Sequence, residues 1–140
     1  MTKQETCDYL LRVRKLQRQI WLLCLRHDEL QSCLLPAAIR YDKDVVQTSP
    51  EDKLSDVAAA VLDIEAKIRQ LQHYKARAIL EVSAIIDKID NETERAILNA
   101  YYVGRISMKK ISEEIGYSLS HTYNLRSHGI KSAGDILDER

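Results

Sequence analysis

Polar side chains near residue 120 are spaced so that one helix face would carry them together. Ser120 lies three and four positions before Tyr123 and Asn124, and residues at these separations are neighbours on a helix surface. An asparagine amide can bond to N6 and N7 of adenine, hydroxyl groups can reach base edges, and a leucine can contact the methyl group of thymine. The base-reading residues predicted on this face are Leu119, Ser120, Tyr123 and Asn124.

Cationic and hydroxyl side chains flank this face. Contacts with phosphates position a protein on a duplex without reading its sequence. The chain has a net charge of zero, so we expect a single copy to bind DNA weakly and to need a second copy or a partner. The predicted phosphate contacts are Lys109, Lys110, Ser118, His121, Arg126, Ser127 and Lys131.

The apolar pattern around Gly116 predicts a helix-turn-helix over residues 106–131. Glycine suits the turn because it adopts left-handed backbone angles without a steric penalty. Ser107 and Ser118 each precede a helical run, where a hydroxyl group can cap the helix. The alternative is a pair of ordinary amphipathic helices in a helical core. The residues expected on the inner faces are Ile111, Ser112, Ile115, Thr122 and Leu125.

A further helix should support this motif from its N-terminal side. Asn91 and Glu94 have the spacing of a capping box, and the apolar residues that follow predict a helix that stops at Gly104. Residues 90–140 are therefore expected to form a three-helix helix-turn-helix domain.

Two long heptad patterns precede that domain. The first predicts a helix over residues 3–34 that Pro36 ends, and the second predicts a helix from Pro50 to about Ile89 with Ser49 as its cap. A connector over residues 35–49 would join them. The sequence thus predicts an all-α protein in which residues 1–89 form a coiled-coil hairpin, within one chain or completed by a second chain. A homodimer through these helices is expected, because a two-helix hairpin alone buries little apolar surface.

Other classes of protein lack support in the sequence. The chain has no glycine-rich phosphate loop and no motif of a hydrolase or metalloprotease, so we predict no enzyme activity, no catalytic residues and no cofactor. Cys24, His27 and Cys33 lack the paired spacing of a zinc site, and no metal is expected. No apolar run is long enough to span a bilayer, and we expect a cytoplasmic protein in a bacterial host.

Residues 91–131, NETERAILNAYYVGRISMKKISEEIGYSLSHTYNLRSHGIK, resemble region 4 of the sigma-70 class. They are still more similar to small phage and prophage regulators that place such a module after an N-terminal coiled coil, with residues 46–68 and 97–118 carrying the likeness. The resemblance implies a recognition helix over about Ser118–His128 that enters the major groove. Leu119 stands where that family has arginine. Gly129 replaces an alanine and is expected to end the helix early.

These observations predict a sequence-specific, dimeric transcriptional regulator of phage or mobile-element origin that binds double-stranded DNA. Two alternatives stay open from the sequence. One is a sigma-like accessory factor that binds RNA polymerase through the helix-turn-helix or the coiled coil. The other is a DNA-packaging component of the small-terminase type, which also combines helix-turn-helix and helical parts.

Overall fold

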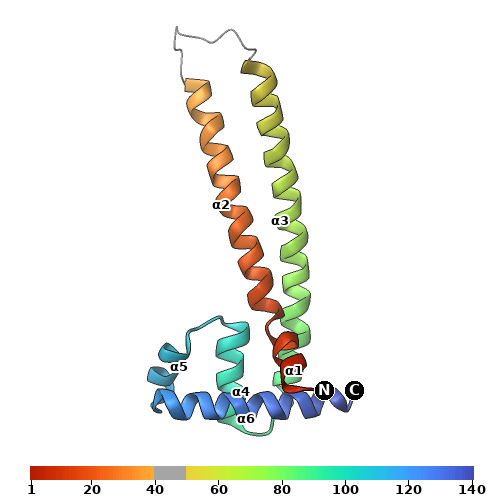
Figure 1. Ribbon diagram of the computed structural model, residues 1–140, viewed down its shortest axis with the longest axis vertical. Coiled ribbons are helices and arrows are strands. Elements are labelled where there is room, and N and C mark those ends of the chain that lie inside the picture. Colours follow the sequence, from red (N-terminus) through yellow and green to blue (C-terminus); the bar gives the residue numbers. More distant parts are fainter. Residues whose placement is uncertain (40–49) are drawn as a thin grey trace. The chain divides into compact units, whose positions relative to one another are not determined.

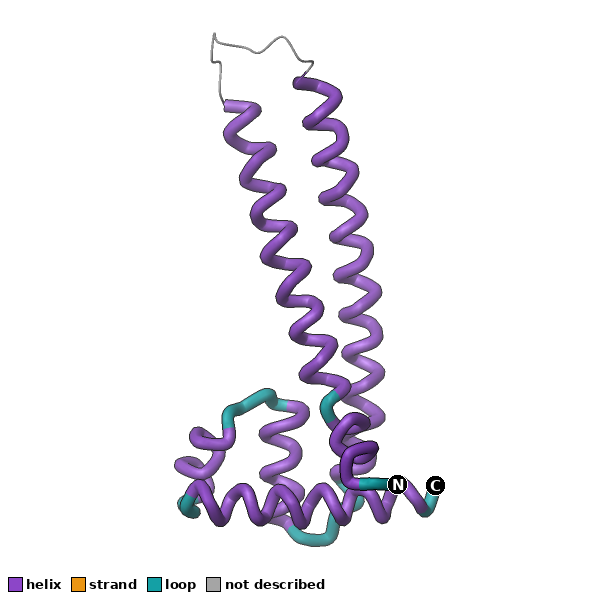
Figure 2. Tube along the Cα trace, viewed as in Figure 1, coloured by secondary structure: helices purple, strands orange, loops and turns teal. Residues whose placement is uncertain are grey.

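The computed structural model describes the backbone of residues 1–39 and 50–140 and the side chains of residues 1–34 and 54–140. Every regular element in these ranges is helical, which confirms the predicted all-α class (Figure 1, Figure 2). The elements are α1 (Lys3–Leu10), α2 (Arg12–Ile39), α3 (Pro50–Ile86), α4 (Glu92–Leu98), the π-helical η1 (Asn99–Val103), α5 (Met108–Ile115) and α6 (Leu119–Asp138).

The chain divides into two compact units. Residues 1–16 and 74–140 form the first, which we call the terminal unit, and residues 17–73 form the second, the hairpin unit. Helix α1 and the C-terminal part of α3 belong to the terminal unit because they share a core with the helices that follow them. The domain boundary between residues 89 and 90 stays a prediction.

In the hairpin unit, α2 and α3 run antiparallel to each other and form the hairpin that the heptad patterns predict (Figure 1). Ile20 of α2 and Val61 of α3 are buried in this unit. His27 of α2 is half-buried, and its Nε2 lies 3.8 Å from a carboxylate oxygen of Glu65 on α3. Most of the predicted connector lies outside the described residues, and so does Ser49, the predicted cap of the next helix. Helix α3 begins at Pro50 as expected.

The prediction of one helix over residues 3–34 ending at Pro36 is wrong at two points. The helix breaks at Leu11, where the carbonyl of Tyr9 accepts a hydrogen bond of 3.2 Å from Nε of Arg12. Helix α2 then continues past Pro36 to Ile39. A proline removes one backbone donor and kinks a helix, but its fixed φ is itself helical. The chain therefore completes the last turn after Pro36.

Helix α3 also ends earlier than the expected Ile89. Its last residue is Ile86, after which the backbone tightens. The N–H groups of Lys88 and Ile89 donate to the carbonyls of Ile85 and Ile86, each three positions back. Such bonds are typical of the final turn of a helix.

The core of the terminal unit draws on both ends of the chain. Helix α1 packs against α6, and Thr6 lies against Gly134 where the two helices meet. A β-carbon at Gly134 would lie 2.8 Å from Oγ1 of Thr6, so this crossing requires a residue without a side chain. The fully buried side chains that meet in this core include Leu10, Val13, Val82, Ile86 and Leu98.

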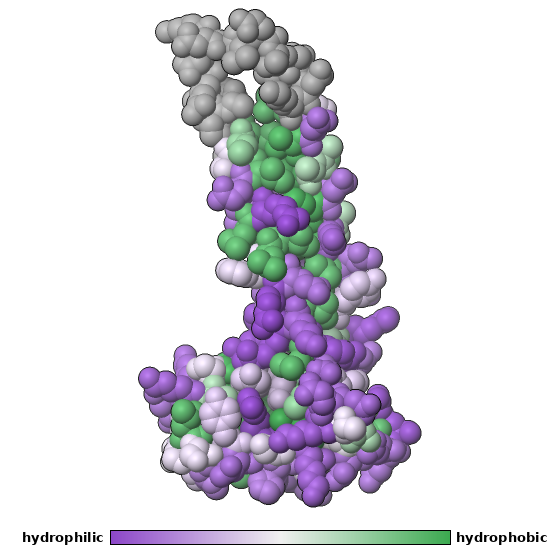
Figure 3. Space-filling model, in the orientation of Figure 1, coloured by the Kyte–Doolittle hydropathy of each residue, from purple (hydrophilic) through white to green (hydrophobic). Residues whose placement is uncertain are grey.

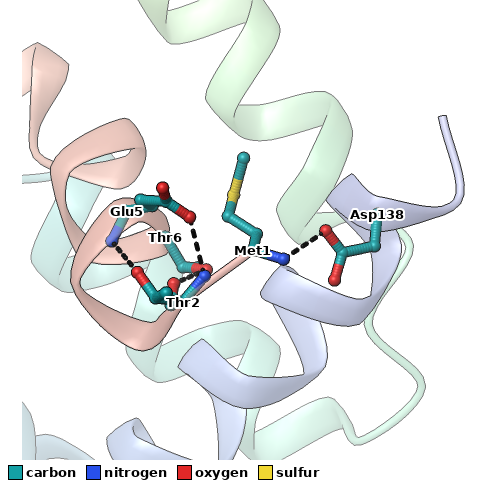
Figure 4. A network of polar contacts seen from close by, with 5 residues as sticks. All are labelled: Met1, Thr2, Glu5, Thr6 and Asp138. Carbon is teal, nitrogen blue, oxygen red and sulfur yellow. Dashed lines mark hydrogen bonds and ion pairs between the residues drawn. The ribbon is translucent and has the colours of Figure 1, made fainter.

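A polar network holds the start of α1 (Figure 4). Thr2 caps the helix, because its hydroxyl accepts from the N–H of Glu5 at 3.1 Å while the Glu5 carboxylate accepts from the N–H of Thr2 at 2.8 Å. The amino group of Met1 lies 2.6 Å from the carboxylate of Asp138 on α6, and this contact raises the pKa of the amine. The network thus joins α1 to the end of α6.

Tyr102 of η1 makes the stability of the terminal unit sensitive to alkali. Its side chain is 2 % exposed, and burial raises its pKa to about 12 from 10.0. A raised pKa means that the stabilisation is complete below pH 10 and is lost as the pH rises through 12. We expect the free energy of unfolding to fall by about 2 kcal/mol by pH 12, and Tyr102→Phe should abolish this loss. Urea unfolding across this pH range measures it. If the free energy of unfolding depends on pH in the same way in the wild type and in Tyr102→Phe, Tyr102 is not the group responsible.

Among the described residues, no helix is both long enough and apolar enough to cross a membrane.

Candidate nucleic-acid interface

The turn between α5 and α6 has the geometry that the sequence predicts. Gly116 has a φ of 79°, in the left-handed region that glycine adopts at little cost. Its N–H and that of Tyr117 both donate to the carbonyl of Ser112, at 3.0 and 3.2 Å. The last turn of α5 is closed in this way, and the chain is redirected into α6.

The two predicted serine caps are confirmed. Oγ of Ser107 accepts a hydrogen bond of 3.3 Å from the N–H of Lys110 at the start of α5. Oγ of Ser118 accepts one of 3.1 Å from the N–H of His121 at the start of α6. Both hydroxyl groups therefore fix where a helix begins, and Ser118, although exposed, already has a backbone partner.

The inner faces of α5 and α6 also agree with the prediction. Ile111, Ser112 and Thr122 are buried, and Ile115 and Leu125 are half-buried against the small core around Ile97 and Met108. The hydroxyl of Thr122 donates to the carbonyl of Ser118 at 2.8 Å, so its burial leaves no polar group unpaired. This packing decides which face of α6 is exposed.

The four predicted base-reading residues are all exposed. They occupy the first turns of α6, and two of them are large apolar or aromatic side chains, Leu119 at 44 % and Tyr123 at 43 % exposure. Ser120 and Asn124 are exposed beside them. The fold thus brings a hydroxyl, an amide, a phenol and an aliphatic side chain to the outer surface of one helix segment.

Most of the predicted phosphate contacts are exposed cations or hydroxyl groups, but Arg126 differs. Its side chain is half-buried, and its guanidinium lies 4.9 Å from the ring centres of both Tyr101 and Tyr123. Nε of Arg126 is buried without a hydrogen-bond partner among the described residues. The exposed members of the set are Lys109, Lys110, Ser118, His121, Ser127 and Lys131.

Helix α6 does not end near His128, so the expectation for Gly129 is wrong. The helix continues to Asp138, and Gly129 is buried within it. The reason is tertiary packing. A β-carbon at this position would lie 3.0 Å from Cδ1 of Leu98 on α4, so the glycine permits a close crossing of the two helices. The first half of α6 forms the exposed motif, and the second half packs against α1 and the core.

The supporting helix is present with a modified end. Asn91 caps α4 by accepting from the N–H of Glu94 at 3.0 Å, as the sequence predicts. After Leu98 the chain continues as the π-helical segment η1, which the sequence did not predict, and Gly104 follows its last residue. The wider turn of η1 contains Tyr101 and Tyr102, whose rings meet edge to face at 4.9 Å.

Arg14 is a positioning residue that the sequence did not reveal. Its Nε donates to the carbonyl of Tyr101 at 2.8 Å and its Nη2 to that of Ile106 at 3.1 Å, while its guanidinium lies 3.8 Å from the ring centre of Tyr101. These carbonyls flank Arg105, which has a φ of 59°. Positive φ is costly for a residue with a side chain, so the loop before α5 needs such external support. The 87 positions between Arg14 and Tyr101 leave no local pattern to detect.

The cysteines and histidines of the hairpin unit form no metal centre that the described residues show. Cys24 is half-buried and Cys33 is exposed. His27 lies near the carboxylates of Asp28 and Glu65, at 3.6 and 3.8 Å. No group of three potential ligands converges anywhere in the described part of the chain.

The fold defines an all-helical protein in which a hairpin of two long helices is followed by shorter C-terminal helices. The chain belongs to the DUF1492 family, described as a protein of unknown function, which it matches over residues 35–133. That range includes α3, the supporting helix and most of the helix-turn-helix. The comparison with curated proteins and the comparison with solved structures each found no match.

Proposed function

We propose that this protein is a sequence-specific DNA-binding transcriptional regulator of phage or mobile-element origin. The observation that carries the proposal is the exposure of the first half of α6 after a capped, glycine-containing turn. Recognition helices of this kind lie in the major groove and contact bases through their N-terminal residues. The resemblance of residues 91–131 to sigma-70 region 4 supports the same role.

The base-reading roles follow from the chemistry of the exposed side chains. Asn124 offers a donor and an acceptor that match N6 and N7 of adenine. Ser120 and Tyr123 can bond to base edges or phosphates, and Leu119 can pack against a thymine methyl group. The exposed cations Lys109, Lys110 and Lys131 contact the phosphate backbone and hold the helix in register.

The charge balance supports binding as a homodimer. The chain has 21 basic and 21 acidic residues, so one copy gains little from releasing counterions. Two copies on one duplex double the base contacts and the phosphate contacts. In the proposal, the long helices α2 and α3 join the copies.

The first test is a selection of bound duplexes from a random-sequence pool at about 0.15 M salt. We expect an enriched inverted repeat with half-sites about one helical turn apart. A single asymmetric element would favour sigma-like reading beside polymerase. The absence of any enriched sequence would overturn the claim that this chain alone reads DNA.

Asn124→Ala separates base reading from general affinity. We expect the selected site to lose about 1–3 kcal/mol of binding free energy while random DNA is bound as before. The matched control is Lys131→Ala, which should weaken binding to both duplexes equally. It should also lower, by about one, the slope of the logarithm of the binding constant against the logarithm of salt concentration. Binding titrations on both duplexes at several salt concentrations give these values. Equal losses on the two duplexes with Asn124→Ala would show that the amide does not read sequence.

A second function is favoured by one observation. Tyr117, Leu119 and Tyr123 are each more than two-fifths exposed, in a chain whose net charge is zero rather than basic. Such a surface also suits a protein partner, which in this context would be RNA polymerase. Co-purification with polymerase together with no DNA affinity of the isolated chain would favour this function over the first.

A further inference from the structure

The hairpin unit leaves its apolar residues incompletely covered. Among its described side chains, Ile20 and Val61 are the apolar residues that are buried, and the others along the α2–α3 contact are half-buried or exposed. Two helices have a single shared face, so each retains an outer face in solvent. Apolar surface that the described residues leave exposed on those outer faces is available to another chain.

The outer face of α2 carries a short heptad seam. Arg18, Leu22, Leu25 and Glu29 follow each other by four, three and four positions, which places them on one side of the helix. At roughly 100° per residue this side lies opposite Ile20, the residue that faces α3. Leu22 is 52 % exposed, Leu25 46 %, and the flanking Trp21 56 %. Figure 3 shows apolar surface over the upper part of the hairpin and mostly hydrophilic surface over its lower part.

The charges of this seam run in a fixed order. The basic Arg18 precedes the two leucines and the acidic Glu29 follows them. All four side chains lie within the hairpin unit, and neither Arg18 nor Glu29 has an ion pair among the described residues. The order of charges therefore decides how a second helix of the same kind can lie on this face.

We propose that this face of α2 is the seam of an antiparallel homodimer, formed with the same face of a second copy of the chain. In antiparallel coiled-coil packing, Leu22 of one copy meets Leu25 of the other, and Arg18 meets Glu29. Each contact occurs twice, because a twofold interface is self-complementary. The two Trp21 side chains flank the leucine layers and lose solvent-exposed surface.

The reversed alignment is unfavourable. In a parallel pair, Arg18 would meet Arg18 and Glu29 would meet Glu29, and like charges that face each other across a helix pair are destabilising. A different protein is not needed to complete the face, because the face already complements itself in charge and in the spacing of its leucines. A second copy is therefore the occupant that the residues specify.

The inference deepens the proposed homodimer by naming its contact residues. The test measures assembly without DNA, so its outcome is separate from that of the DNA selection. A dimer that selects no sequence would overturn the DNA-reading function and leave the seam intact. The opposite outcome is also distinguishable. If the chain selects a DNA sequence but the seam variants leave its dimerisation unchanged, the seam is wrong and the DNA-reading function stands.

The experiment is a charge exchange on the full-length protein, followed by sedimentation equilibrium over a range of concentrations. Arg18→Glu and Glu29→Arg should each raise the dimer dissociation constant by about tenfold, since each replaces two attractive pairs with two repulsive ones. The double variant should restore the wild-type dissociation constant, because the pairs re-form with exchanged partners. Leu22→Glu should leave only monomer.

Controls on α3 make the test specific. Arg69→Glu introduces the same change of charge at an exposed position, and Leu62→Glu introduces the same apolar-to-acidic change at a residue that is 66 % exposed. Both should remain dimeric, with unchanged helix content by circular dichroism. A monomeric wild-type protein at every concentration, or a double charge exchange without recovery, would overturn the proposal. Dissociation by Leu62→Glu but not by Leu22→Glu would also overturn it.

Discussion

Leu98→Ala is expected to lower the free energy of unfolding by about 2–5 kcal/mol. Leu98 is fully buried at the end of α4, in the core that also contains Ile130 of α6. Removing its three outer carbon atoms loses their transfer free energy and leaves a cavity that rigid helices cannot close. Urea unfolding followed by circular dichroism measures the change.

The close crossing of Leu98 and Gly129 makes this prediction sharper. A β-carbon at Gly129 would lie 3.0 and 3.1 Å from Cδ1 and Cγ of Leu98, so Gly129→Ala alone crowds the crossing. In the double variant, the new methyl group enters the space that Leu98→Ala has vacated. We expect the double variant to be more stable than the sum of the single changes predicts, by about 1 kcal/mol. Additive effects would mean that the two positions do not contact each other in solution.

Arg14→Ala is expected to destabilise the terminal unit by about 2–3 kcal/mol. Each hydrogen bond from a charged donor contributes about 1.5–3 kcal/mol, and water that bonds to the freed carbonyls recovers part of this stabilisation. Arg14→Lys should recover little, because a single ammonium group cannot reach two carbonyls in the planar geometry of a guanidinium. The stacking on Tyr101 is lost in both variants.

The same variants should also weaken binding to the selected DNA site. The carbonyls of Tyr101 and Ile106 lie on either side of the loop that leads into α5, so losing their donor frees this loop. Arg77→Ala, an exposed arginine of α3 in the same unit, is the matched control and should change stability by less than about 0.5 kcal/mol. If Arg14→Ala and Arg77→Ala change the free energy of unfolding equally, Arg14 does not position the loop before α5.

The features that the sequence could predict are those that depend on neighbouring residues. Ser107, Ser118 and Asn91 each accept a hydrogen bond from an N–H three positions later, and Gly116 adopts its left-handed turn from local preference alone. The heptad periods placed the two long helices because buried spacing follows helix geometry. The exposed face of α6 followed in the same way from its inner stripe.

The features that escaped prediction depend on residues far apart in the chain. The length of α6 could not be read from Gly129, because a glycine that ends a helix and one that admits Leu98 look the same in sequence. The bonds from Arg14 to the loop before α5 have no local signal. Likewise, nothing near Leu11 in the sequence indicates that the Arg12 side chain takes a backbone carbonyl there.

The way in which the terminal unit is assembled constrains how the protein can fold during its synthesis. Helix α1 leaves the ribosome long before the part of α6 on which it packs, and Met1 and Asp138 are 137 positions apart. The hairpin unit, whose contacts are contiguous in sequence, can close first. The core around Leu10 and Val13 is complete only when the C-terminal helix has been made, and apolar surface that stays exposed until then favours aggregation.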